Sequence, residues 1–136
     1  AAIMESKKNE NILINCSRTT FPMEKNAMRW ANYIGNRCFA ILISILINKQ
    51  VSDSLCGTKV FSRKFFNLMK KNGSWDSKSD PFGDFTIIFE AAKNNIKILN
   101  YPVRYYARKS GAPNISRWID GLKLLKVCLI YLVSDI

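Results

Sequence analysis

The sequence contains no histidine, so it lacks the side chain that most often binds zinc and titrates near neutral pH. Its four cysteines are widely spaced and include no CxxC pair, which argues against a structural zinc site. We therefore expect reduced, mostly buried thiols rather than a disulfide framework. The cysteines are Cys16, Cys38, Cys56 and Cys128.

Acidic residues are also few: 10 Asp and Glu stand against 21 Lys and Arg, which gives a net charge of +11. This charge indicates an anionic partner, and nucleic acid, an anionic membrane surface and a phosphorylated substrate all fit it. The densest cationic segment, 104–117, also contains Pro and Gly and is predicted to be a loop.

No secretory leader and no internal linker are visible in this sequence. The chain begins Ala1-Ala2-Ile3, and we expect it to be part of a longer protein. Its 136 residues, 48% of them apolar, are enough for one domain with a core. The composition therefore indicates a single folding unit.

Apolar patterning predicts alternating helices and strands, and thus an α/β fold. Strands are expected at 11–16 and at 96–106, the latter at an edge because of Pro102, and 51–61 is a strand or an extended loop. Helices are expected at 26–48 with Gly35 as a potential break, at 64–71 after the cap Ser62, at 84–93, and at 118–133.

The last predicted helix is amphipathic, with Lys123 and Lys126 away from its apolar face. Such a helix suits a lipid headgroup layer, and it suits packing on its own or another domain equally well. The most apolar part of helix 26–48 covers about ten residues, fewer than the roughly 20 that span a bilayer, so a core or membrane-surface helix is expected. The apolar face of the last helix comprises Trp118, Leu122, Leu125, Leu129 and Leu132.

The run VSDSLCGTKV at 51–60 combines a carboxylate, a glycine and two donors at one end of an apolar strand. The glycine permits close backbone approach, and the lysine could face a phosphate. A turn with solvated charges explains the same pattern. The candidate site residues of this run are Asp53, Gly57, Thr58 and Lys59.

A second candidate, Asp84, lies in the run DPFGDF at 80–85, at the start of a predicted helix among several phenylalanines. Burial there could tune its proton affinity for chemistry. Helix capping is the other interpretation, because Asp is favoured near helix N-termini.

The third candidate segment is the basic loop RKSGAPNISR at 108–117. Fixed positive charges beside short hydroxyl and amide donors suit a phosphate, although basic loops are usually just solvated. Its candidate residues are Arg108, Gly111, Asn114, Ser116 and Arg117.

These three segments, in this order, resemble glycosyltransferase family 2, especially dolichol-phosphate mannose synthases and similar bacterial polyprenyl-phosphate glycosyltransferases. They look like the family's Thr-Asp-x-x-x-Gly-(Phe/Thr)-(Arg/Lys), Asp-Pro-Phe-Gly-Asp-Phe and Ala-Arg-x-x-Gly-x-x-Asn-Ile-Ser-Arg segments. Upstream, Ser17-Arg18 and FPMEKNAMR at 21–29 are similar to its Gly-Ser-Arg and Tyr-Pro-Met-Glu-x-x-Ala-Met-Arg. The sequence departs from the family at Cys16, where Gly is usual, and at Ala112 and Pro113.

The resemblance implies an inverting enzyme that moves a sugar from a nucleotide-sugar donor to a polyprenyl phosphate at the cytoplasmic face of a membrane. Asp84 would orient the phosphate acceptor or a metal-bound sugar, and it would deprotonate the acceptor if that were a sugar hydroxyl. Asp53, Gly57, Thr58 and Lys59 would shape the sugar and phosphate site, and the candidates in 108–117 would hold phosphates.

The resemblance also implies a partial GT-A-type domain, with a mixed α/β acceptor-side region at 10–117 and the amphipathic helix at 118–136. The nucleotide-binding N-terminal half, with the Asp-x-Asp-type motif that holds Mg²⁺ or Mn²⁺ in the intact enzyme, has no counterpart in this sequence. The isolated chain is expected to be inactive, because donor, leaving diphosphate and acceptor must be held in line.

An alternative function is a basic, non-catalytic module that binds RNA or an anionic membrane surface. Trp30, Tyr101, Tyr105 and Tyr106 would supply stacking surfaces, although no nucleic-acid motif is present and the resemblance implies no nucleic-acid partner. A third hypothesis is a scaffold that binds lipid phosphate without catalysis.

Overall fold

The computed structural model describes residues 11–25, 27–75, 80, 82–107 and 117–134, with the backbone alone described at 117, 118 and 134. These residues form four helices and a three-stranded mixed sheet. The expected α/β class is therefore confirmed, and the finer GT-A assignment stays a prediction.

The sheet is built around β1 (Ile12–Ser17), with strand order β2-β1-β3. β2 (Lys59–Val60) pairs with β1 antiparallel, and β3 (Lys97–Pro102) pairs with it parallel. The strands predicted at 11–16 and 96–106 thus form, and of segment 51–61 only the two residues of β2 are strand. Pro102 ends β3 at the sheet edge, as predicted, where its missing N–H interrupts no ladder.

Each predicted helix forms, with shifted ends at the first one. Helix α2 (Trp30–Ile47) begins later than expected and continues through Gly35, and the left-handed Asn48 ends it. The Ser62 side chain accepts a 3.2 Å hydrogen bond from the Phe65 N–H, which confirms the predicted cap. The remaining helices are α3 (Arg63–Lys71), α4 (Asp84–Lys93) and α5 (Arg117–Ser134).

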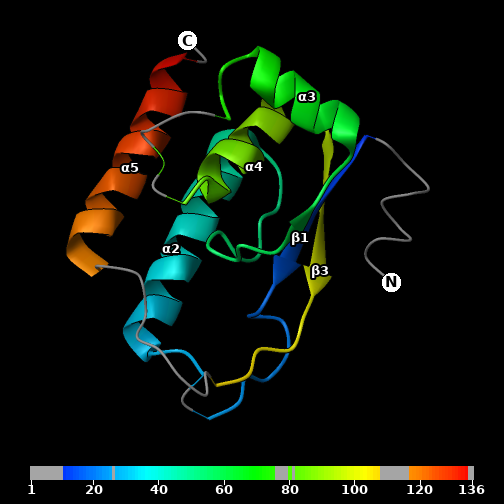
Figure 1. Cartoon of the computed structure of the whole chain (residues 1–136). Helices are drawn as coiled ribbons and strands as arrows, with labels where there is room; N and C mark the ends of the chain where they lie inside the picture. The colour runs from blue at the N-terminus through cyan, green and yellow to red at the C-terminus, as the bar shows by residue number, and fades with distance from the viewer. Residues whose placement is uncertain (1–10, 26, 76–79, 81, 108–116, 135–136) are drawn as a thin grey trace.

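The sheet, the pair α2 and α4, and α5 lie in succession across the molecule (Figure 1). Helix α4 packs on β3, and α5 packs on both α4 and α2. The core fills the space between these layers, with Leu13 and Ile98 from the sheet against Ile43, Phe85 and Ile88 from the helices. Burial of these apolar side chains is the main stabilising contribution.

The apolar face predicted for the last helix is not the face that packs on the domain. The side chains of Leu122, Leu125, Leu129 and Leu132 are between 42% and 69% exposed. A second apolar stripe at helical spacing provides the contact instead, because α5 carries apolar residues around most of its circumference. That packed stripe consists of Leu124, Val127, Cys128 and Tyr131.

Candidate functional site

Two of the three candidate segments meet at one buried ion pair. The Lys59 Nζ atom lies 2.5 Å from Asp84 Oδ1, and only 2% of the lysine side chain and 10% of the aspartate side chain are exposed. Lys59 projects from β2 and Asp84 from the first turn of α4. The lysine also donates a 2.7 Å hydrogen bond to the Cys56 carbonyl oxygen, so the pair is held on both sides.

The N-terminus of α4 is capped by Asp80 rather than by Asp84. The Asp80 carboxylate accepts hydrogen bonds from the Phe82 N–H at 3.1 Å and the Thr86 N–H at 2.8 Å. Gly83, immediately before the helix, has a φ of 72° and offers no side-chain cap. Asp84 lies in the first turn, where a carboxylate is favoured, but its described hydrogen bond goes to Lys59 and the described capping bonds go to Asp80.

The surroundings of Asp84 make its carboxyl easier to protonate than that of a free aspartate. Burial raises the pKa of the Asp84 carboxyl above its ordinary value, and the charge and hydrogen bond of Lys59 oppose only part of this effect. The nearby charge of Asp80 raises the pKa further. A carboxylate of this kind is suited to accept or share a proton, which is the property that acid and base catalysis uses.

Asp53 occupies a different environment, enclosed by hydrogen-bond donors. Arg18 binds it through two side-chain nitrogens, Nε at 2.8 Å and Nη2 at 2.9 Å, and through its backbone N–H at 2.9 Å. Asn36 Nδ2 and the Leu55 N–H donate the remaining bonds, at 2.7 Å and 3.2 Å. Because Asp53 is 0% exposed and its carboxylate accepts all of these bonds, it positions Arg18, Asn36 and the backbone at Leu55.

Arg18 also makes Asp53 harder to protonate. Burial alone would raise the pKa of Asp53, but the hydrogen bonds and charge of Arg18 outweigh burial and hold the pKa below its ordinary value. The Arg18 guanidinium lies 5.2 Å from the centroid of the Tyr105 ring, which connects this network to the chain after β3.

Gly57 and Thr58 lie in the exposed loop that leads into β2. A side chain added at Gly57 would meet nothing within 4 Å, so protein packing does not require glycine there. The Thr58 carbonyl oxygen accepts the Cys16 N–H at 3.2 Å. These two exposed residues directly precede Lys59, and their contact with a substrate stays a prediction.

The predicted phosphate loop cannot be placed relative to this ion pair. Arg108, Gly111, Asn114 and Ser116 lie outside the described residues, and Arg117 is described only as the first backbone position of α5. Their roles stay predictions.

Several polar residues of the interior were not among the predicted site residues. Asn15 donates to the Asp53 carbonyl oxygen at 2.9 Å, and Asn36 Oδ1 accepts the Ser54 N–H at 2.9 Å. Asn100 Oδ1 accepts the Ser52 N–H at 3.0 Å. An asparagine inside an otherwise apolar strand run was the available signal for Asn15, because a buried amide requires partners.

The implied divalent cation finds no ligand set among the residues that the structure describes. No group of three or more Cys, Asp or Glu side chains there could hold a metal ion. Asp84 is bound to Lys59, and Asp53 is surrounded by N–H donors. Since Mg²⁺ needs several free oxygen ligands, these residues do not fit it.

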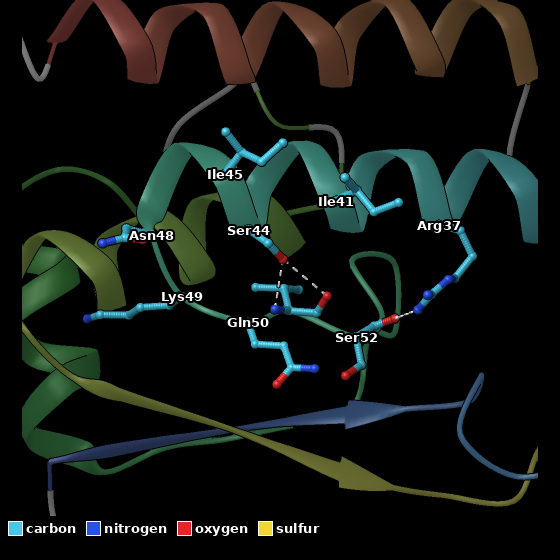
Figure 2. Close-up of a pocket in the computed structure, with 9 residues that line it drawn as sticks. Arg37, Ile41, Ser44, Ile45, Asn48, Lys49, Gln50 and Ser52 are labelled. Carbon is cyan, nitrogen blue, oxygen red and sulfur yellow. Dashed lines mark hydrogen bonds between the residues drawn. The ribbon is translucent and has the colours of Figure 1, made fainter.

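An open groove of about 610 Å³ lies along α2, apart from the ion pair. Figure 2 shows Arg37 near one end and Lys49 near the other, with Ser44 between them. The Ser44 Oγ atom accepts the Val51 N–H at 2.9 Å and so fixes the chain that follows α2. The groove is lined by Arg37, Ile41, Ser44, Ile45, Asn48, Lys49, Gln50, Val51 and Ser52.

Comparison with known proteins identifies no family: no protein-family model matches the chain, and neither a curated protein nor a solved structure matches it.

Proposed function

We propose that the chain is the acceptor-side part of an inverting glycosyltransferase that transfers a sugar from a nucleotide-sugar donor to a polyprenyl phosphate. The observation that carries this proposal is the buried pair of Lys59 and Asp84. Its members come from two separate motifs of the family resemblance, 25 residues apart in sequence. Ionisable groups in such surroundings are more frequent at functional sites than elsewhere.

The chemistry assigns different tasks to the two side chains. An acceptor phosphate oxygen forms the new bond to the anomeric carbon while the bond from that carbon to the donor diphosphate breaks. Because the phosphate is already ionised, it attacks without losing a proton, and Asp84 orients the acceptor. Lys59 provides positive charge for the phosphate, and its buried position makes that charge effective.

With a hydroxyl acceptor, Asp84 would take the proton instead. Its raised pKa brings its proton affinity closer to that needed by a general base. The dependence of the rate on Asp84 therefore distinguishes the two acceptor classes: removing the carboxylate abolishes transfer to a hydroxyl and weakens transfer to a phosphate.

Catalysis also needs a donor site, which the described residues do not offer. We expect the isolated chain to be inactive and the intact protein to bind the nucleotide and its divalent cation elsewhere. Asp53 would support the site indirectly, since it holds Arg18 and the backbone that leads toward Lys59.

A membrane surface at the cytoplasmic side is the proposed location, because a polyprenyl phosphate resides there. The exposed apolar face of α5 supports contact with lipid. By length and composition alone, α2 is the one described helix that could cross a bilayer, with a mean hydropathy of 1.3. Core helices meet the same criterion, and α2 carries Asn36 bonded to the buried Asp53.

The test uses the intact protein, labelled nucleotide-sugars and polyprenyl phosphate. Asp84→Asn and Lys59→Met should each lower transfer by roughly 100-fold or more, the usual loss when an electrostatic group is removed from a site. Glu90→Gln, on the same helix as Asp84, is the matched control and should retain activity. Full activity in both site variants would contradict the proposal.

A second candidate, a non-catalytic RNA-binding module, is favoured by one observation. Trp30 is 76% exposed and Tyr106 is 63% exposed, as stacking side chains would be. This module should be retained on single-stranded RNA at low salt and released as salt rises, and Trp30→Ala should weaken retention about tenfold. Absence of retention at low salt would eliminate this function.

A further inference from the structure

Three polar residues form a row across the sheet, on the face that the helices cover. Asn15 of β1 lies opposite Lys59 of β2 and opposite Asn100 of β3 in the strand register. Leu13 and Ile98, the preceding register pair on this face, belong to the core under the helices. The side chains of Lys59, Asn15 and Asn100 therefore project into the same layer as Asp84.

Asn15 has a fixed orientation and an acceptor without a partner. Its Nδ2 atom donates to the Asp53 carbonyl oxygen at 2.9 Å and to Asn100 Oδ1 at 3.3 Å. The first bond excludes the flipped amide, which would place two oxygens together. The Oδ1 atom is buried and accepts no hydrogen bond from the residues that the structure describes.

The strand on the other side of Asn15 is β2. The Nδ2 atom of Asn15 bonds Asn100 of β3, and β2, with Lys59 as the register partner of Asn15, flanks the opposite edge of β1. The Cys16 N–H bonds the Thr58 carbonyl oxygen, so the adjacent pair, Asn15 and Lys59, is a non-hydrogen-bonded pair of the antiparallel ladder. In such pairs the two Cβ atoms are only about 4.5–5.5 Å apart.

Lys59 in turn has one more N–H than its two described acceptors use. An ammonium group has three donors, and the Cys56 carbonyl oxygen and Asp84 Oδ1 take two. A buried donor and a buried acceptor thus lie on neighbouring residues of one sheet face.

From this arrangement we propose that Asn15 is a positioning residue, whose Oδ1 receives the Lys59 ammonium when Asp84 turns to the acceptor substrate. This inference rests on the proposed function, because only catalysis requires Asp84 to leave Lys59. With Asn15 in place, the cation stays at the phosphate site without its carboxylate. Without Asn15, release of Asp84 would leave the buried ammonium with the Cys56 carbonyl oxygen alone.

The test measures exchange of the Lys59 ammonium protons with water by nitrogen-15 NMR, on the full 136-residue chain. The Asp84→Ala variant imitates the released carboxylate, because alanine offers Lys59 no acceptor. In that background we expect Asn15→Leu to accelerate exchange roughly tenfold, the effect of losing one hydrogen bond to a charged group. In the background that retains Asp84, Asn15→Leu should change the exchange rate less than about twofold.

Asn15→Asp separates the acceptor role from a merely structural one. It retains an oxygen for Lys59 but loses the amide donor to the Asp53 carbonyl oxygen. In the Asp84→Ala background we expect it to keep the ammonium protons protected. Equal acceleration by Asn15→Leu and Asn15→Asp, or no acceleration by either, would overturn the inference.

If Asn15→Leu does not fold, Asn15→Ser takes its place, because the shorter hydroxyl side chain does not reach Lys59. It should expose the ammonium protons to the same extent. Neither measurement requires sugar transfer, so loss of activity for other reasons does not affect the result. If the NMR results are as expected but Asp84→Asn remains fully active in the intact protein, the role of Asn15 as an acceptor for Lys59 stands and the proposed function fails.

Discussion

At the scale of single residues, two buried aspartates show how surroundings determine the role of a carboxylate. The pKa of Asp53 lies below its ordinary value, because Arg18 and its hydrogen bonds outweigh burial. The pKa of Asp84 lies above its ordinary value, because burial outweighs Lys59. Asp53 is thus a structural anchor that is harder to protonate than a free aspartate, whereas Asp84 is easier to protonate.

We expect Asp53→Asn to reduce the free energy of unfolding by about 3 kcal/mol or more, because it leaves the guanidinium of Arg18 without its buried partner. The stability that Asp53 contributes is fully present above its unfolded pKa of about 3.9 and is lost as pH falls through the lower folded pKa. Urea titrations between pH 6 and pH 2 measure both effects.

Glu90→Gln is the control for this measurement, since it also removes one carboxylate. The Asp53→Asn variant should show a shallower loss of stability below pH 4 than the control, because the titrating group has been removed. Parallel acid profiles for the two variants would show that Asp53 is not the anchor described above.

At the scale of elements, the first turn of α4 connects helix stability to the ion pair. Asp80 caps the helix through the Thr86 N–H, and its charge also raises the pKa of Asp84. The cap Asp80 and the candidate catalytic group Asp84 therefore lie within one turn. A substitution of Asp80 should change both the stability of α4 and the pKa of Asp84.

Asp80→Ala should reduce the free energy of unfolding by about 1 kcal/mol, and Asp80→Asn by much less because Asn caps nearly as well. Both changes should lower the pKa of Asp84, because both remove a neighbouring negative charge. Carbon-13 NMR titration of the aspartate carboxyls follows this shift. Ser62→Ala, which removes the cap of α3, is the control: it should cost a similar stability and leave the pKa of Asp84 unchanged.

The elements also show which features local sequence could predict. The cap Ser62 and the edge position of Pro102 were predictable because their signals lie within a few residues of the structure they form. The capping role of Asp80 was missed because it acts across Gly83. The pairing of Lys59 with Asp84 depends on how α4 lies over the sheet, so no local pattern contained it.

The sequence left burial on α5 open for a related reason. Both Leu124 and Leu125 belong to apolar stripes at helical spacing, and the sequence does not say which stripe contacts α4. Leu124 is 1% exposed and Leu125 is 42% exposed, so a step of one residue separates the two outcomes.

At the scale of the whole molecule, a net charge of +11 accompanies the apolar outer face of α5. Anionic lipid satisfies both features, since it accepts apolar side chains and attracts cations. We expect the double variant Leu125→Glu and Leu129→Glu to bind phosphatidylglycerol vesicles at least about tenfold more weakly, because two exposed apolar contacts are lost. Vesicle co-sedimentation measures the change.

The urea midpoint of this double variant should stay close to the original value, because both side chains lie outside the core. Val127→Ala, on the packed face, is the matched control: it should lower the urea midpoint and leave vesicle binding unchanged. Unchanged vesicle binding by the double variant would show that α5 does not contact lipid.

The parallel pairing of β1 with β3 has a consequence for folding in the cell. Ile12 of β1 pairs with Lys97 of β3, so β1 emerges from the ribosome long before its parallel partner strand β3. Pairings between such distant residues form slowly, and an unpaired strand edge promotes aggregation in the meantime. The yield of soluble protein should therefore depend on how well β1 is shielded during synthesis, and slower translation or chaperone supply would act at this step.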